Sequence, residues 1–152
     1  MISYGSGVNK VTPEDIAELL RTLVFLHLHH GKFVGERKAI LEGVVYEFSR
    51  SSAVMIFFDR GISDSSPRMS RAVASLLDAA DYEAVKDHEW YFELYEKALR
   101  SPDWCIRLFT AEAFARLRQR EESLKDHRCY NRIVRMIKND REGRVAEVAC
   151  GW

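Results

Sequence analysis

The chain has little proline, glycine and cysteine: its 152 residues include three prolines, eight glycines and three cysteines. So few helix breakers exclude a long low-complexity linker. Cys105, Cys129 and Cys150 are odd in number and widely spaced, which matches neither a disulfide framework nor the spacing of zinc ligands. The sequence therefore predicts free thiols, a reducing cytoplasmic location and no structural metal.

Neither an excess of charge nor a long hydrophobic run is present. Lysines and arginines number 23, as many as the acids, whereas a protein whose whole surface attracts nucleic acid is normally basic. The longest apolar stretch, residues 19–28, is interrupted by Arg21 and His27 and is too short to span a membrane. Residues 1–10 lack the apolar segment of a signal peptide. With 47% hydrophobic and 30% charged residues, the composition is that of one soluble domain.

Helical periodicity is the dominant pattern. Each proline follows a hydroxyl residue, in Thr12-Pro13, Ser66-Pro67 and Ser101-Pro102, and such pairs predict an N-cap followed by the first helical position. Apolar residues then recur every three or four positions, and no alternating strand pattern of any length is found. The ambiguous run Val54–Phe58 is interpreted as a helix end. The sequence thus predicts an all-α fold of about seven helices, over residues 13–29, 36–50, 67–80, 87–100, 102–119, 127–139 and 142–151.

A repeat of 39 residues relates two parts of the C-terminal half. With this shift, a stripe of Tyr91, Leu94, Tyr95 and Ala98 aligns with Tyr130, Ile133, Val134 and Ile137, and a second stripe that begins at Asp103 aligns with one that begins at Glu142. A unit of about 40 residues with two helices is typical of helical-repeat proteins. An earlier copy is less regular: a shift of 39 residues aligns Asp64 with Asp103, whereas a shift of 35 residues aligns Ser66-Pro67 with Ser101-Pro102. We interpret residues 1–50 as a capping helix pair and residues 51–152 as repeats, within a single domain.

The segment Ser101–Ala113 resembles the turn and second helix of a HEAT repeat. A turn with proline and an acid is followed by Ile106-Arg107 and then by small residues one turn later. Residues 139–149 are a second match, although Ala146 stands where the family has arginine. The resemblance to this HEAT/armadillo-like family covers about residues 66–152. It implies an α-solenoid, or a compact bundle, of stacked antiparallel helical hairpins, in which an acid and an arginine bond across the turn and hold the repeats together.

This resemblance and the arginine-rich second half favour a non-enzymatic module that binds another protein on a concave helical face. Residues 100–144 contain ten arginines and two lysines against seven acids. An acidic protein or peptide is the expected partner, and the arginines expected to project toward it are Arg68, Arg71, Arg107 and Arg118. Trp90 and Phe92 lie off the apolar stripe of their helix, so they either add an aromatic patch to this interface or cover a neighbouring helix.

Two alternatives assign other roles to the chain. A class of HEAT-like DNA glycosylases places tryptophan, aspartate and arginine on a concave face, and by this resemblance Asp103, Trp104, Arg107 and Arg144 would contact nucleic acid. The other alternative is a small HEAT-like lyase or enzyme subunit that acts on a carrier protein. The sequence has no glycine-rich phosphate loop, nucleophile elbow or paired-carboxylate motif, so no catalytic residue and no cofactor are expected.

Two smaller features complete the sequence-based expectations. His27, His29 and His30 are the densest group of potential metal ligands, but neighbouring helical positions point about 100° apart, so we interpret them as the last turn of a helix rather than a metal site. The apolar residues Val145 and Trp152 need a cover, so we expect association of two copies, or another partner, at the C-terminal repeat. No membrane partner is expected.

Overall fold

The described part of the chain is all-helical. The computed structural model describes residues 10–152, in which nine α-helices and two 3₁₀-helices occur and no strand. The α-helices are α1 (Pro13–Leu28), α2 (Glu36–Glu47), α3 (Ser52–Ile62), α4 (Pro67–Ala74), α5 (Tyr82–Val85), α6 (Glu89–Leu99), α7 (Trp104–Arg120), α8 (Tyr130–Lys138) and α9 (Gly143–Val148). The 3₁₀-helices are η1 (Leu77–Ala79) and η2 (Glu122–Asp126). The all-α prediction is confirmed.

None of the described helices is both long and apolar enough to cross a membrane. The prediction about a signal peptide lies, apart from Lys10, outside the described residues.

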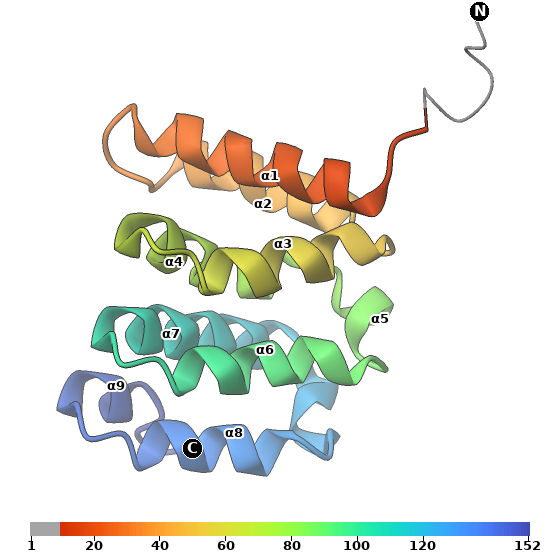
Figure 1. Ribbon diagram of the computed structural model, residues 1–152. Coiled ribbons are helices and arrows are strands. Elements are labelled where there is room, and N and C mark those ends of the chain that lie inside the picture. The colour runs from red at the N-terminus through yellow and green to blue at the C-terminus, as the bar shows by residue number, and fades with distance from the viewer. Residues whose placement is uncertain (1–9) are drawn as a thin grey trace, which may run out of the picture.

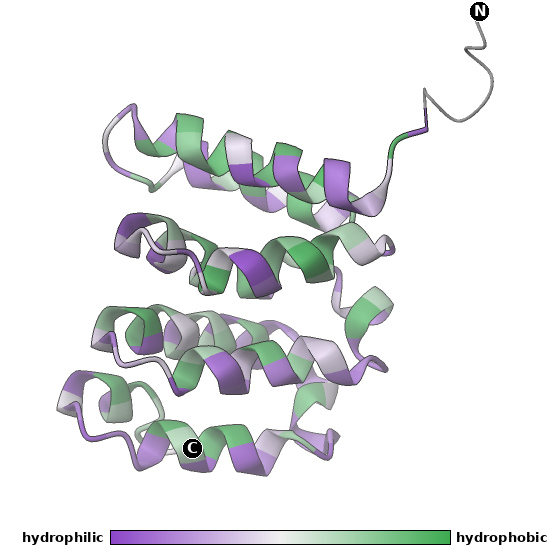
Figure 2. Ribbon diagram, in the orientation of Figure 1, coloured by the Kyte–Doolittle hydropathy of each residue, from purple (hydrophilic) through white to green (hydrophobic). Residues whose placement is uncertain are grey.

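Consecutive helices pair, and the pairs lie one above another (Figure 1). The layers are α1/α2, α3/α4, α6/α7 and α8/α9, and α5 lies on the path from the second layer to the third. Along one side of the stack α1, α3, α6 and α8 contact in succession, and on the other side α4 contacts α7 and α7 contacts α9. Figure 2 shows hydrophobic and hydrophilic residues alternating along the helices, as expected when each helix packs one face against its neighbours.

The prediction of seven helices is wrong in two places. The run around Val54–Phe58 does not end an earlier helix but belongs to α3, which starts at its own N-cap, Ser51. The predicted helix over 67–80 stops at Ala74, and η1 and the four-residue α5 follow before α6. After α4 the apolar pattern continues through Leu76 and Leu77 into η1, so periodicity alone does not reveal this second break.

Polar caps explain where the helices begin. Thr12 and Ser66 cap α1 and α4 with their side chains, and Pro13 and Pro67 follow directly, as predicted. Ser101-Pro102 does not start α7: Asp103 is the N-cap and accepts from the backbone N–H of Cys105 over 2.8 Å. A carboxylate at this position also complements the positive end of the helix dipole.

The 39-residue repeat corresponds to matching burial in the third and fourth layers. Its eight aligned positions in α6 and α8 are all buried: Tyr91, Leu94, Tyr95, Ala98, Tyr130, Ile133, Val134 and Ile137. Asp103 and Glu142 cap α7 and α9 in the same way, each accepting the N–H two residues on. The earlier copy matches neither proposed shift, because the N-cap of α4, Ser66, lies 37 positions before Asp103.

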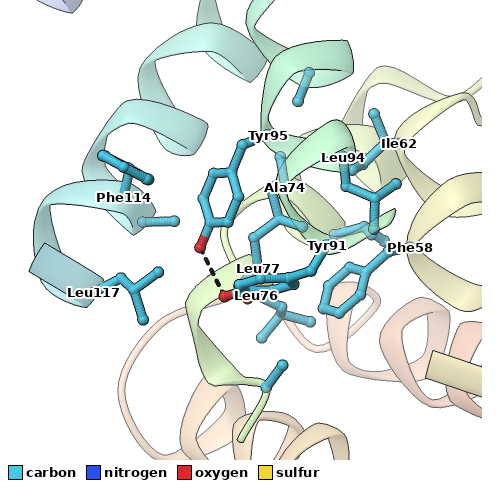
Figure 3. Close-up of a cluster of buried hydrophobic side chains, with 14 of the residues drawn as sticks. Phe58, Ile62, Ala74, Leu76, Leu77, Tyr91, Leu94, Tyr95, Phe114 and Leu117 are labelled. Atoms are coloured by element: carbon cyan, nitrogen blue, oxygen red, sulfur yellow. Dashed lines mark hydrogen bonds between the residues drawn. The ribbon is translucent and has the colours of Figure 1, made fainter. Parts of the chain in front are cut away.

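The centre of the core is aromatic. Tyr91 and Tyr95 on α6 are fully buried, and Figure 3 shows their hydroxyls facing each other between side chains of neighbouring helices. The Tyr91 hydroxyl donates to the carbonyl of Leu77 over 2.8 Å, so the Tyr95 hydroxyl, 3.0 Å away, donates to Tyr91. Both polar groups are thereby satisfied inside an apolar core.

Candidate functional site

An open groove of about 410 Å³ lies where the first three layers meet. Its walls come from the α1–α2 connection, α2, α4 and α7, which are brought together by the stacking of the layers. The lining residues are Leu28, Gly31, Lys32, Phe33, Val34, Lys38, Arg68, Arg71, Ala72, Ser75, Phe109, Glu112 and Arg116. We call this the basic groove, because it contains five cations and one carboxylate.

Two of the five cations are held by aspartates just outside the groove. The Nε atom of Arg71 donates to Oδ2 of Asp103 over 2.9 Å. Arg116 makes a bidentate contact with Asp78, with donor–acceptor distances of 3.0 and 3.1 Å. These pairs fix the two guanidinium groups in place and neutralise part of their charge.

The other three cations have no carboxylate within 4.0 Å among the described residues. They are Lys32, Lys38 and Arg68, and of these Arg68 donates to the backbone carbonyl of Leu28 over 2.7 Å. Partial burial, and next the charge of Arg116, lower the pKa of Lys38 below its usual 10.5. The more distant acids Glu42, Asp78 and Glu112 oppose this shift without reversing it. The fold therefore holds like charges together without a complete set of counter-ions.

Between the cations the groove is apolar. Phe33, Ala72 and Phe109 line it as buried or half-buried side chains, and Val34 is exposed at its edge. An apolar wall next to exposed cations suits a ligand that carries both a hydrophobic group and negative charge.

An arginine–aspartate ladder fixes the layers that form the groove. In each step the Nε atom of an arginine donates to Oδ2 of an aspartate in the next layer: Arg21 to Asp64 over 3.3 Å, Arg71 to Asp103 over 2.9 Å and Arg107 to Asp140 over 2.9 Å. Burial alone would raise the pKa of Asp103, but the hydrogen bonds from Arg71 and from the N–H of Cys105 outweigh it and hold that pKa below its usual value. Asp103 thus stays charged and keeps Arg71 oriented.

The arginines predicted to contact a partner divide between the groove and the interior. Arg68 and Arg71 lie in the basic groove. Arg107 is buried, 4% exposed, and donates to Asp140 and to the carbonyl of Ser101, so it is not available to a partner. Arg118 donates to the Tyr130 hydroxyl over 2.7 Å and lies over the ring of Trp152, away from the groove. Arg107 and Arg118 therefore support the packing of the third and fourth layers.

The two aromatic residues predicted at the interface have different surroundings. Phe92 is fully buried and stacks on His127 with ring centroids 3.9 Å apart, so it covers a neighbouring segment. Trp90 is half-buried and lines a second hollow, of about 710 Å³, against α3 and α6. Both acidic and basic side chains line that hollow. Ion pairs between them, such as Lys97–Asp59 at 2.7 Å, neutralise part of their charge. Unlike the basic groove, this second hollow has no excess of positive side chains.

The residues of the nucleic-acid alternative are already engaged within the chain. The guanidinium of Arg144 lies 3.9 Å from the centroid of the Trp104 ring and covers it. Asp103 and Arg107 are members of the ladder. None of these four residues lines the basic groove.

Sequence reasoning missed Lys32, Lys38 and Arg116 as groove residues. They lie far apart in the chain and belong to no common motif, so only the stacking of the layers brings them together. The arginine-rich segment 100–144 contributes only one cation, Arg116, to the groove, so the unequal distribution of arginines did not indicate its location.

Within residues 10–152, no group of three or more histidine, cysteine or acidic side chains is arranged to hold a metal ion. His29 serves as the C-cap residue of α1. Comparisons with models of protein families, with curated proteins and with solved structures found no match to this chain.

Proposed function

We propose that this chain is a non-enzymatic interaction module whose basic groove binds an acidic segment of another protein. The ligand would place carboxylates against Lys32, Lys38 and Arg68 and an apolar side chain against Phe33 and Phe109. Binding of this kind recruits a partner without any chemical step.

The observation that carries the proposal is the group of three groove cations, Lys32, Lys38 and Arg68, that have no carboxylate within 4.0 Å among the described residues. Lys38 loses hydration and lies near Arg116, so its charge costs stability in the free chain. An acidic ligand would remove that cost, because its carboxylates would lie beside Lys38 in the basic groove, where few water molecules reach the charge. Charged groups held at such a cost are more frequent at functional sites than elsewhere.

We further propose a HEAT-like α-solenoid as the architecture. Four stacked helix pairs, the equivalent N-caps of α7 and α9, and the arginine–aspartate ladder between consecutive layers support it. A cytoplasmic location is also proposed and is supported by free Cys105, Cys129 and Cys150.

The test compares the affinities of the full chain for three labelled probes. The first is a short peptide of glutamates around one phenylalanine, the second replaces the glutamates by lysines, and the third is a single-stranded oligonucleotide. Fluorescence anisotropy should show saturable binding of the acidic peptide at least about tenfold tighter than that of the basic peptide, because opposite charges attract in the groove.

Two results would overturn the proposal. One is equal affinity for the acidic and the basic peptide. The other is tighter binding of the oligonucleotide than of the acidic peptide, with an affinity that falls steeply with salt as phosphate contacts require. The second result would favour the nucleic-acid alternative.

A further inference from the structure

Lys38 on α2 has surroundings that none of the other six lysines shares. Its side chain is half-buried in the wall of the basic groove. The ion pairs and side-chain hydrogen bonds that lysines make within residues 10–152 belong to Lys86, Lys97 and Lys138, and none belongs to Lys38. Every fully buried side-chain nitrogen in this part of the chain has a hydrogen-bond partner, so the Lys38 nitrogen, which has none, is open to the groove.

The remaining lysines are either exposed or paired with an acid. Lys86 is half-buried, but its nitrogen lies 2.8 Å from a carboxylate oxygen of Glu83. The other five are exposed: Lys10, Lys32, Lys97, Lys125 and Lys138. Only Lys38 therefore combines a partly dehydrated side chain with a nitrogen that no other described group contacts as a partner.

These surroundings favour the neutral form of the Lys38 amine. Partial burial disfavours the charged ammonium and the guanidinium of Arg116 repels it, and both effects lower the pKa of Lys38. Glu42, Asp78 and Glu112 attract the ammonium and oppose this shift only in part. A neutral amine has the lone pair that attacks a carbonyl carbon, and dehydration and a neighbouring cation are the two ways in which proteins activate a lysine for this reaction.

The groove around Lys38 suits a small carbonyl compound that also carries negative charge. Its volume is about 410 Å³, and the rings of Phe33 and Phe109 in its wall would contact an apolar body. Lys32 and Arg68 line the same groove and have no carboxylate partner among the described residues, so they would bind an acidic group. A potential nucleophile, an apolar wall and two free cations thus lie in one hollow.

We propose that Lys38 is a covalent attachment site for small aldehydes that carry an anionic group. The amine nitrogen bonds to the carbonyl carbon, and both hydrogens of the neutral amine leave with the carbonyl oxygen as water. The product is an imine, which water can hydrolyse again, so the step needs no oxidant or reductant. The site shares the basic groove with the proposed function but does not depend on it, because no protein partner takes part.

Reductive labelling of the folded full chain tests the site. The protein is incubated near neutral pH with para-formylbenzoate and cyanoborohydride, which reduces an imine to a stable amine, and peptide mass spectrometry measures the label at each lysine. At low conversion we expect Lys38 to be labelled at least about threefold faster than any other lysine, because more of its amine is neutral. This preference should disappear in urea-unfolded protein. Equal labelling of the seven lysines in the folded chain would overturn the proposal.

The methyl ester of the same aldehyde tests the role of the anionic group. It has the same ring and the same carbonyl group but no negative charge, so it cannot pair with Lys32 and Arg68. The preference for Lys38 over the other lysines should fall at least about threefold with the ester. An equal preference with both probes would overturn the choice of an anionic ligand.

Lys38→Arg separates covalent attachment from peptide binding. Arginine keeps the positive charge of the groove but has no amine that forms a stable imine, so the fast phase of labelling should be lost while the affinity for the acidic peptide changes less than about threefold. Circular dichroism checks that the variant is folded. A fast phase that persists in this variant would show that the reactive group lies elsewhere. Failure of the acidic peptide to bind the wild type would contradict the proposed function and leave the labelling result unchanged.

Discussion

Arg107 on α7 bonds to Asp140 across the boundary between the third and fourth layers, with Nε 2.9 Å from Oδ2 and both side chains about 5% exposed. The equivalent pair one layer earlier, Arg71–Asp103, has the same 2.9 Å distance but leaves the arginine side chain 40% exposed. The same arginine–aspartate hydrogen bond is therefore shielded from water in one pair and partly accessible to water in the other. Because of this difference, Arg107 stabilises the packing of the layers, whereas Arg71 remains accessible in the basic groove.

Arg107→Ala should destabilise the chain far more than Arg71→Ala. Removing one partner of a buried pair leaves the other charge without compensation, which costs about 3–5 kcal/mol, whereas an exposed pair contributes about 0–1 kcal/mol. Urea unfolding followed by circular dichroism measures both losses. If the two substitutions cost the same, the assignment of Arg107 to the interior is incorrect.

Gly61→Ala should destabilise the contact between α3 and α4, by about 1–3 kcal/mol. A Cβ atom at Gly61 would lie 2.7 Å from a methyl group of Val73, which is fully buried. Gly43→Ala is the matched control: it lies within α2 with nothing within 4 Å of its Cβ position, so it should stabilise by about 0.5–1 kcal/mol. Thermal melting of the two variants should show shifts of opposite sign, and shifts of the same sign would contradict this packing.

The buried tyrosine pair predicts a loss of stability at alkaline pH. Burial raises the pKa of Tyr91 and of Tyr95 above their usual 10.0. Because the folded-state pKa is the higher one, the stabilisation is complete below pH 10 and falls above it, by about 1.4 kcal/mol per pH unit for each tyrosine. Tyr95→Phe removes one titrating group, so its stability should fall less steeply than that of the wild type between pH 10 and 11. Parallel pH profiles of the two proteins, from urea unfolding, would contradict the buried environment of Tyr95.

Lys38→Met should have opposite effects on stability and on binding. The substitution removes a charge whose pKa is lowered by burial and by Arg116, so the free chain should become more stable. The same change should weaken binding of the acidic peptide, because one of the three cations without a carboxylate is lost. Calorimetric melting and peptide titration of the same sample measure both. A destabilised variant with unchanged affinity would mean that Lys38 serves the fold.

The sequence was sufficient for some levels of structure and not for others. The apolar period predicted helices throughout, and the aligned stripes of α6 and α8 proved to be buried at every position, because burial of one helix face is a local pattern. The separate helix α3 was missed: the prediction ended a helix at residue 50 and interpreted Val54–Phe58 as a helix end, although the polar run of residues 49–52 contains the N-cap Ser51. Local pattern does not determine how many turns interrupt an apolar run.

The site was harder to predict for a physical reason. Arg107 and Arg68 lie 39 positions apart and each stands in the first turn of its helix, yet one is buried against Asp140 and the other is exposed in the groove. Whether such an arginine is buried or exposed depends on the helix pair that packs next to it in the folded chain. Lys38 and Arg116 lie 78 positions apart and meet only through stacking of the layers.

The most direct test of the central claim is the affinity of the acidic peptide for two charge-reversal variants. Lys32→Glu combined with Arg68→Glu reverses two cations of the groove, and Arg60→Glu combined with Arg135→Glu reverses two exposed arginines outside it. Both variants have the same net charge, so any difference between them reports position. We predict at least a tenfold loss of affinity for the groove variant and a change of less than about threefold for the control. Equal losses in the two variants would show that binding follows net charge alone and would contradict the basic groove as the binding site.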